Sequence, residues 1–302
     1  MPLSEACKAE LTALKIPIRF EEPMQMHTSF RIGGCADAFV SPTGAEDISV
    51  VIELCRKYDV PCSIIGNGSN LLVADSGVAG VVIACGNHMN TVTVSGETVC
   101  AQAGVLLSSL AAAAARHGLS GLEALAGIPG TLGGAVYMNA GAYGTEMRDI
   151  VVETTYLDAD CCVAAIQGPA HQFGYRRSCF TDTDNIIISS RMKLKKADPA
   201  RIREAMAVYA ARRRDKQPLE YPSAGSTFKR PEGHFAGALI EGAGLKGYRI
   251  GGAAVSQKHA GFIINTGNAT ASDVFRLIEH IKNEVYKKYG VSLECEVKLL
   301  GF

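Results

Sequence analysis

The sequence has no excess of charge of either sign, no long apolar run and no metal-binding spacing of cysteines. Lysine plus arginine and aspartate plus glutamate each number 30 in 302 residues. The chain therefore lacks the net positive charge that would indicate a nucleic-acid partner. No apolar run reaches the roughly 18 residues of a membrane-spanning helix, so we expect no membrane partner. The opening MPLSEACKAEL lacks a basic region followed by an apolar one, which predicts no signal peptide.

The ten cysteines form neither a C-x-x-C pair nor a Cys/His cluster at zinc spacing. Cys161 and Cys162 are adjacent, so a bridge between them would be strained. We therefore expect reduced thiols, no metal site and a cytoplasmic protein. With 47% hydrophobic and 20% charged residues, the chain has the composition of a globular protein with room for about two domains.

Two glycine-rich stretches are the most informative features that are present: IIGNGSNLL (64–72) and GLEALAGIPGTLGGAVYMNAGAYG (121–144). Without Cβ atoms, a backbone can approach a bulky ligand closely, and consecutive free N–H groups suit a diphosphate. The first stretch reads G-x-G-x-x-L, lacks the third glycine of a Rossmann fingerprint and leads into a strand. One such stretch could be a tight turn only, but the pair favours a large nucleotide held mainly by loops.

Hydrophobic periodicity and turn residues predict a mixture of helices and strands. We expect helices at 4–16, 45–58, 106–117, 199–214, 236–243 and 272–289, the last with Ser272 as N-cap and Gly290 as its stop. We expect strands at 61–65, 71–73, 81–83, 91–103, 151–157, 162–166, 186–194, 261–265 and 291–300, and a strand–turn–strand unit at 30–40. Two prolines within 217–222 mark a loop or boundary.

Seven blocks, in order, resemble the UDP-N-acetylenolpyruvoylglucosamine reductase family: HTSFRIGG (27–34), IIGNGSNLL (64–72), GLEALAGIPGTLGGAVYMNAGAYG (121–144), FGYRRSCF (173–180), AGSTFKRP (224–231), GLKGYRIGGAAVSQKHAGFIIN (244–265) and LECEVKLLGF (293–302). The resemblance implies an α+β fold. It would comprise a two-subdomain FAD-binding fold of the vanillyl-alcohol-oxidase/PCMH type and a C-terminal α+β substrate-binding domain. The expected parts are 1–85, 86–198 and 199–302.

The resemblance also implies the reaction: NADPH reduces bound FAD, and hydride passes from flavin N5 to C3 of an enolpyruvyl UDP-sugar. Arg176 matches the family's arginine at the substrate carboxylate, Glu296 the glutamate that stabilises the intermediate, and Ser226 the serine that protonates C2. Strand alternation would turn the neighbouring Arg177 to the opposite face. Glu294 and Glu296 would share a face of the last strand, so the residues alone leave both open, and only the family match selects Glu296.

Matched positions imply the remaining contacts. Those expected at FAD are Arg31, Asn67, Gly68, Ser69, Asn70, Ala126, Gly127, Ile128, Pro129, Gly130, Thr131, Gly133, Gly134 and Asn139. Those expected at the UDP-sugar are Tyr175, Lys229, Lys246 and His259. His259 stands where some relatives carry glutamine, so a packed or surface histidine is the alternative at that position.

The chain resembles the short form of the family, because the segment from Arg176 to Ser226 has no room for the extra loop whose tyrosine closes over the substrate. We expect a monomer. One alternative is another flavoenzyme with the same cofactor fold, such as a sugar or lactone oxidase, but no histidine that could tether a flavin lies in 64–72. A second is a non-enzymatic nucleotide-binding protein, which would not be expected to keep Arg176, Ser226 and Glu296. A serine hydrolase is disfavoured because Ser226 lies in A-G-S-T-F, not in G-x-S-x-G.

Overall fold

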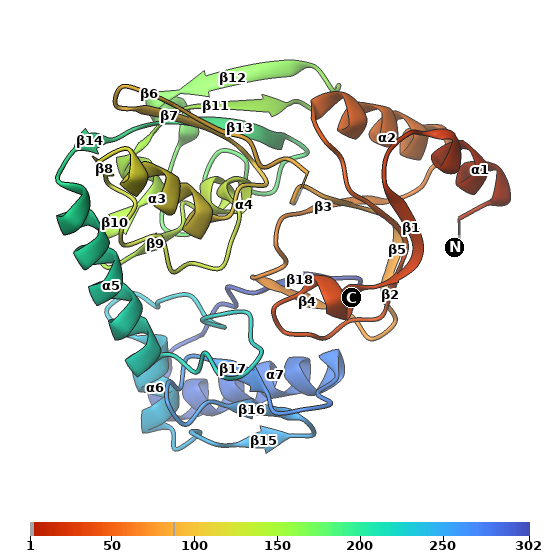
Figure 1. Cartoon of the computed structure of the whole chain (residues 1–302). Coiled ribbons are helices and arrows are strands. Elements are labelled where there is room, and N and C mark those ends of the chain that lie inside the picture. The colour runs from red at the N-terminus through yellow and green to blue at the C-terminus, as the bar shows by residue number, and fades with distance from the viewer. Residues whose placement is uncertain (1–2, 87) are drawn as a thin grey trace. The chain divides into compact units, whose positions relative to one another are not determined.

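The computed structural model describes residues 3–86 and 88–302, and Figure 1 labels its elements. The described chain forms two compact units. Unit 1 comprises the residues up to Phe20 together with Asp37–Asn67 and Gly80–Arg212, and unit 2 comprises Glu21–Ala36, Gly68–Ala79 and Arg213–Phe302. Neither unit is one continuous stretch, because the N-terminal third of the chain contributes to both. The finer division at residues 85 and 198 stays a prediction.

Unit 1 contains an antiparallel sheet with the strand order β12–β11–β13–β7–β6. Its strands are β6 (Val92–Ser95), β7 (Thr98–Gln102), β11 (Val151–Leu157), β12 (Val163–Gln167) and β13 (Ile186–Lys193). The last three confirm the predicted strands, whereas the single strand expected at 91–103 is two antiparallel strands, β6 and β7, joined by a turn with Gly96 at a φ of +59°. The predicted α3 (Leu107–Arg116) and the unpredicted α4 (Leu132–Tyr137) share one apolar core with this sheet. A six-residue helix inside a glycine stretch carries too little periodicity to be read from sequence.

A second core of unit 1 lies around α1 (Glu5–Ala13), α2 (Ala45–Lys57), β3 (Cys62–Ile65) and β5 (Val78–Ala84). The strand order is β1–β2–β5–β3, with β1 (Ile18–Pro23) and β2 (Cys35–Val40), and β3 runs parallel to β5. The strand–turn–strand unit predicted at 30–40 was wrong in its first strand. Only β2 forms, since Arg31 (φ +55°) and Gly33 (φ +133°) turn the backbone before it.

Unit 2 is built on the antiparallel sheet β15 (Arg249–Ile250), β16 (Ala253–Val255) and β17 (Ile263–Asn265). The long α7 (Ala271–Tyr289) packs on β15 and β16 and against α6 (Ala236–Gly242), as Figure 1 shows. Beside it, β4 (Leu71–Val73) pairs in parallel with β18 (Lys298–Leu300). The predicted strand at 291–300 was therefore too long, because only its last three residues are in a ladder.

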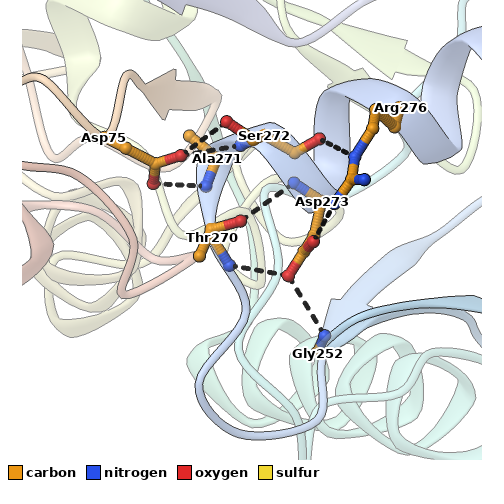
Figure 2. Close-up of polar contacts among 7 residues, drawn as sticks. All are labelled: Asp75, Gly252, Thr270, Ala271, Ser272, Asp273 and Arg276. Carbon is orange, nitrogen blue, oxygen red and sulfur yellow. Dashed lines mark hydrogen bonds and ion pairs between the residues drawn. The ribbon is translucent and has the colours of Figure 1, made fainter.

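The start of α7 differs from the prediction, as Figure 2 shows. The N-cap is Thr270, whose hydroxyl accepts from the N–H of Asp273 (3.0 Å), while the Asp273 carboxylate accepts from the N–H of Thr270 (3.2 Å). Ser272, the predicted cap, donates its hydroxyl to Asp75, which also accepts from the N–H groups of Ala271 and Ser272 (2.7 and 2.9 Å). The predicted end at Gly290 is confirmed, with a left-handed φ of +67°.

The remaining elements are short connections and one long helix. They are 3₁₀ turns η1 (Met24–His27), η2 (Met147–Asp149) and η3 (Gly168–His171), strands β8 (Leu119–Ser120), β9 (Gly141–Ala142), β10 (Thr145–Glu146) and β14 (Lys195–Lys196), and helix α5 (Pro199–Lys216). The helix α5 confirms the prediction of a helix with proline at its start.

Candidate functional site

The two glycine stretches meet in unit 1. The Asn67 side-chain amide donates to the Pro129 carbonyl at 2.8 Å. A Cβ on Gly66 would lie 2.4 Å from the Thr131 hydroxyl oxygen, closer than any real Cβ contact. The absence of a side chain at Gly66 is therefore what lets the end of β3 approach Thr131. Of the predicted cofactor residues, the structure thus brings Asn67 together with Pro129 and Thr131.

Thr131 carries the clearest sign of a missing polar partner. Its side chain is 2% exposed, and its hydroxyl has no hydrogen-bond partner among the described residues. Leaving a buried hydroxyl unpaired costs about 1–3 kcal/mol. The neighbouring backbone is fixed, since the Gly133 N–H donates to the Ala103 carbonyl at 2.8 Å. A ligand oxygen at this position would satisfy the hydroxyl, which fits the phosphate or ribitol part of a large nucleotide.

Asn139, predicted to lie beside the cofactor, has a structural role in the protein. It is fully buried, and its side-chain N–H groups donate to Glu146 (2.9 Å) and to the Gly174 carbonyl (3.0 Å). Its side-chain oxygen accepts from the Arg148 N–H at 2.9 Å. Both N–H groups of the Asn139 side chain are thus used within the protein, and its predicted place in the wall beside the cofactor stays a prediction. Asn139 supports the turn that carries Arg176.

That turn corrects the expected strand at Arg176. Gly174 and Arg177 exchange backbone hydrogen bonds of 3.0 and 3.4 Å, which makes Tyr175 and Arg176 the corner of a tight turn. Arg176 has a left-handed φ of +55°, an uncommon conformation for a residue with a side chain, of a kind that clusters at functional sites. Its guanidinium lies 5.2 Å from the centre of the Tyr175 ring. A corner, not strand alternation, separates Arg176 from Arg177, which packs along Gly174.

In unit 2, Thr227 joins the segments that carry Ser226 and Glu296. Ser226 pairs with Phe262 in an isolated bridge, and the Thr227 N–H donates to the Gly261 carbonyl at 2.8 Å. The Glu296 N–H donates to the Thr227 carbonyl at 2.8 Å. The buried Thr227 hydroxyl accepts from the Ile263 N–H at 3.1 Å. The structure therefore places Ser226 and Glu296 on neighbouring segments, joined through Thr227.

The second half of the first glycine loop reaches the same place. The Asn70 amide donates to the Glu296 carbonyl at 3.1 Å, and the Asn70 carbonyl accepts from the Lys298 N–H at 2.9 Å. Gly68 has a φ of +59°, and a Cβ there would meet the His27 carbonyl oxygen at 1.9 Å. Only glycine fits that position. Arg31, also predicted at the cofactor, is exposed, and its N–H donates to the Thr28 carbonyl at 3.1 Å.

The surroundings of the two glutamates near the C-terminus distinguish them. Glu294 is exposed, and its carboxylate pairs with the ammonium of Lys229. Glu296 is half-buried and is held at both backbone groups, by Thr227 and by Asn70. Their segment is not a regular strand, so a shared strand face does not describe them. The more buried and better fixed position of Glu296 favours it over Glu294 as the candidate that stabilises the intermediate.

The predicted substrate cations each have an acidic neighbour. Lys229 pairs with Glu294, and Lys246 pairs with Glu241 at 2.7 Å. Tyr175 is 46% exposed, which leaves its ring accessible.

His259 is packed, in agreement with the alternative that the sequence left open. Its Nδ1 accepts from the Gly261 N–H at 3.1 Å, and its ring meets the Phe262 ring edge to face at 4.9 Å. Burial lowers the pKa of His259 below its usual value, and the positive charge of Lys246 acts in the same direction. The imidazole is therefore neutral near pH 7, with Nδ1 as acceptor.

The structure shows two residues that sequence reasoning missed. Thr227 is adjacent to Ser226, but nothing in A-G-S-T-F sets it apart from a packed threonine. His171 is buried two residues before FGYRR, and the Thr154 hydroxyl that meets its Nε2 lies 17 residues away in sequence. Among residues 3–86 and 88–302, no group of three or more His, Cys, Asp or Glu side chains could hold a metal. All ten cysteines are free.

No helix within the described residues is long and apolar enough to cross a membrane.

Comparisons with known proteins cover both units. A family model described as "FAD binding domain" matches residues 36–164, and one described as "UDP-N-acetylenolpyruvoylglucosamine reductase, C-terminal domain" matches residues 217–300. The chain is 49% identical over 284 residues to the UDP-N-acetylenolpyruvoylglucosamine reductase of Syntrophomonas wolfei, which covers 94% of this chain and 95% of the relative. It is 46% identical to the enzyme of the same name from Clostridium perfringens, again over 94% of this chain and 93% of the relative.

The solved structure of the UDP-N-acetylenolpyruvylglucosamine reductase from Thermus caldophilus is similar in fold. It matches with a TM-score of 0.80 and 35% identity, over 95% of this chain and 99% of that one. Likeness of this extent in sequence and in fold, along nearly the whole length of each relative, confirms the predicted α+β architecture with its FAD-binding part and C-terminal domain. The chain belongs to the UDP-N-acetylenolpyruvoylglucosamine reductase family.

Proposed function

We propose that the chain reduces UDP-N-acetylglucosamine enolpyruvate to UDP-N-acetylmuramate, a precursor of peptidoglycan, with NADPH as reductant and FAD as bound cofactor. Family membership supports the reaction, and the match to an FAD binding domain supports the cofactor. The assignment of residues depends on one observation above others: Thr227 hydrogen-bonds the segments of Gly261 and Glu296, and so sets Ser226 beside Glu296.

The residues of unit 1 fit the cofactor. The unpartnered Thr131 hydroxyl and the close approach at Gly66 form a cradle that a nucleotide oxygen would complete. FAD, when bound, takes electrons from NADPH and supplies the hydride that adds to C3 of the enolpyruvyl group. Asn67 and the backbone of 126–134 would hold it.

Arg176 is proposed to bind the substrate carboxylate. A guanidinium stays charged at all relevant pH values and can form two parallel hydrogen bonds with a carboxylate. Addition of hydride at C3 places negative charge on C2 and on the carboxylate, so this contact strengthens as the reaction proceeds. The tight turn at Gly174–Arg177 fixes where the side chain begins.

Glu296 and Ser226 are proposed to complete the reduction. Glu296, in its protonated form, donates a hydrogen bond to the developing enolate. Ser226 gives its hydroxyl proton to C2, forming the new C–H bond. A hydroxyl is a weak acid, so this transfer needs the strongly basic carbon that hydride addition creates. Ser226 is exposed in the structure, which leaves its hydroxyl accessible to a substrate.

Lys229, Lys246, Tyr175 and His259 are proposed to contact the UDP-sugar. The two lysines are cations suited to the diphosphate, and their carboxylate partners Glu294 and Glu241 would be exchanged for phosphate oxygens on binding.

We further propose that the enzyme acts as a monomer in the cytoplasm. All three proposed catalytic residues belong to one chain, and ten free cysteines suit a reducing compartment. Light scattering on the purified protein tests the first point, since a dimer would show twice the mass of the chain.

A Ser226→Ala variant tests the residue assignment. We expect NADPH to reduce its FAD at the wild-type rate, while reoxidation by the enolpyruvyl sugar falls by roughly 100-fold or more, since general acid catalysis contributes about 100-fold to 10,000-fold. Rapid-mixing absorbance measurements separate the two half-reactions. Ser223→Ala, three residues away in the same loop, is the matched control and should reoxidise normally. Normal reoxidation of Ser226→Ala would refute the proton-donor role.

A further inference from the structure

A buried histidine lies outside the residues given a role above. His171 and Thr154 are fully buried, and Ser190 is 3% exposed. The His171 Nδ1 lies 2.9 Å from the Gly168 carbonyl oxygen, and Nε2 lies 2.9 Å from the Thr154 hydroxyl. The Thr154 hydroxyl is 3.0 Å from that of Ser190, its partner across the β11–β13 ladder. The imidazole is thus fixed at both nitrogens.

The hydrogen bonds determine the form of the ring. A carbonyl oxygen can only accept, so Nδ1 carries the proton that it donates to Gly168. In the neutral ring, Nε2 then accepts from the Thr154 hydroxyl, which in turn accepts from Ser190. Burial lowers the pKa of His171, and the hydrogen bond to Gly168 opposes that shift only in part. The neutral form therefore dominates near pH 7.

The charged groups near His171 do not offset the effect of burial on its pKa. Glu153 and Arg191 flank Thr154 and Ser190 in sequence, but they lie on the other face of the pleat and pair with each other at 2.6 Å. The turn Gly168–His171 contains no other ionisable side chain. On the following loop, burial raises the pKa of the Cys179 thiol, so it stays protonated. The loop's other ionisable groups are the phenol of Tyr175 and the guanidinium groups of Arg176 and Arg177.

His171 also closes the loop that carries those arginines. Its ring stacks on Phe173 with ring centres 4.8 Å apart and an angle of 8° between the planes. Its carbonyl accepts from the Cys179 N–H at 2.8 Å. The segment between these two attachments contains the Gly174–Arg177 turn with Arg176 at its corner. One residue therefore holds both ends of the Arg176 loop.

We propose that His171 is a positioning residue for the reduction, which sets the direction of Arg176 by clamping both ends of the loop 171–179. This inference rests on the proposed role of Arg176 as the carboxylate-binding residue. A displacement of about 1 Å at a substrate-positioning group can cost roughly 100-fold in rate, so a loosened clamp has a measurable effect.

The test is a double-mutant cycle with His171→Asn and Arg176→Ala in the FAD-loaded enzyme. Asparagine keeps a donor for Gly168 but loses the ring that stacks on Phe173. We expect kcat to fall by about 10-fold to 100-fold in the wild-type background and by less than about twofold in the Arg176→Ala background. The FAD content and the rate of flavin reduction by NADPH should not change. His117→Asn, at an exposed histidine whose Nδ1 also meets a carbonyl (2.9 Å), is the matched control.

The outcomes separate two failures. If Arg176→Ala turns over like wild type, the proposed role of Arg176 is wrong. If Arg176→Ala is impaired but His171→Asn costs the same factor in both backgrounds, only the clamp is wrong. Should His171→Asn fail to fold, Phe173→Leu removes the stack while it leaves the buried hydrogen bonds in place. The same background-dependent loss of kcat would support the clamp, and wild-type kcat would overturn it.

Discussion

Gly66 is the residue at which backbone geometry and cofactor binding are most closely connected. A Cβ at this position would lie 2.4 Å from the Thr131 hydroxyl oxygen, which is buried and has no partner among the described residues. A methyl group there must push Thr131 or the β3 end apart, at the point where the nucleotide is proposed to bind. If the nucleotide binds here as proposed, the shape of the loop at this residue affects cofactor affinity.

We therefore expect Gly66→Ala to weaken FAD binding by at least about 10-fold, equivalent to roughly 1.4 kcal/mol. Fluorescence titration of the apoprotein with FAD measures this directly. Gly44→Ala is the control, because no atom lies within 4 Å of a Cβ built there and its φ of −172° is open to any residue. Equal affinity of Gly66→Ala and wild type would show that the cradle does not hold the cofactor.

The sequence offered candidates for catalysis, whose roles stay predictions, but it did not indicate which residues hold them in place. Arg176, Ser226 and Glu296 stand in recognisable motifs. Thr227 and His171 do not, since their importance comes from partners such as Gly261 and Thr154 that are brought close only by the fold. The place of Asn139 beside the cofactor stays a prediction, and the hydrogen bonds from its side chain to Glu146 and Gly174 could not be read from the sequence. The spacing of residue types along the sequence does not reveal such contacts between distant residues.

At the scale of elements, the N-terminus of α7 shows how a helix end is fixed from a distance. The pattern Thr270-x-x-Asp273 is a capping box that the sequence contains, whereas the use of Ser272 by Asp75 depends on the loop after β4 (Figure 2). Long helices and alternating strands were predicted closely. Short elements such as α4 and β15 were not, because their few residues carry little periodicity.

Replacing Asp75 with asparagine should destabilise unit 2 by about 1 kcal/mol, the usual value for loss of a helix cap. Partial burial opposes ionisation of Asp75, but the hydrogen bonds from Ala271 and Ser272 outweigh it and lower its pKa. A carboxyl group with a lowered pKa in the folded state stabilises the protein above the unfolded-state pKa, and that contribution is lost as the pH falls through the folded-state value.

Wild-type unfolding free energy should therefore drop below about pH 4, the unfolded-state pKa of aspartate, and the drop should be smaller in Asp75→Asn. Urea unfolding at a series of pH values measures both curves. Asp158→Asn, at a turn of unit 1 that makes no hydrogen bond to α7 within the described chain, is the comparison and should keep the wild-type pH dependence of the unfolding free energy. Parallel curves for wild type and Asp75→Asn would contradict the assignment.

At the scale of the whole molecule, the chain builds two units from interleaved segments. The glycine stretches alone indicated a nucleotide held by loops, and the ordered motifs indicated the family, which the comparisons confirm. Interleaving could not be read from the sequence. The first glycine loop looks like one motif, yet Asn67 belongs to unit 1 and Gly68 to unit 2. Residues adjacent in sequence can thus belong to different compact units.

The most direct test of the whole account is NADPH oxidation by the purified wild-type protein, with and without the enolpyruvyl UDP-sugar. The account predicts a yellow protein that releases FAD on denaturation, and rapid loss of NADPH absorbance only when the sugar is present, with UDP-N-acetylmuramate formed in equal amount. A colourless protein without flavin, or NADPH oxidation that is the same without the sugar, would contradict it.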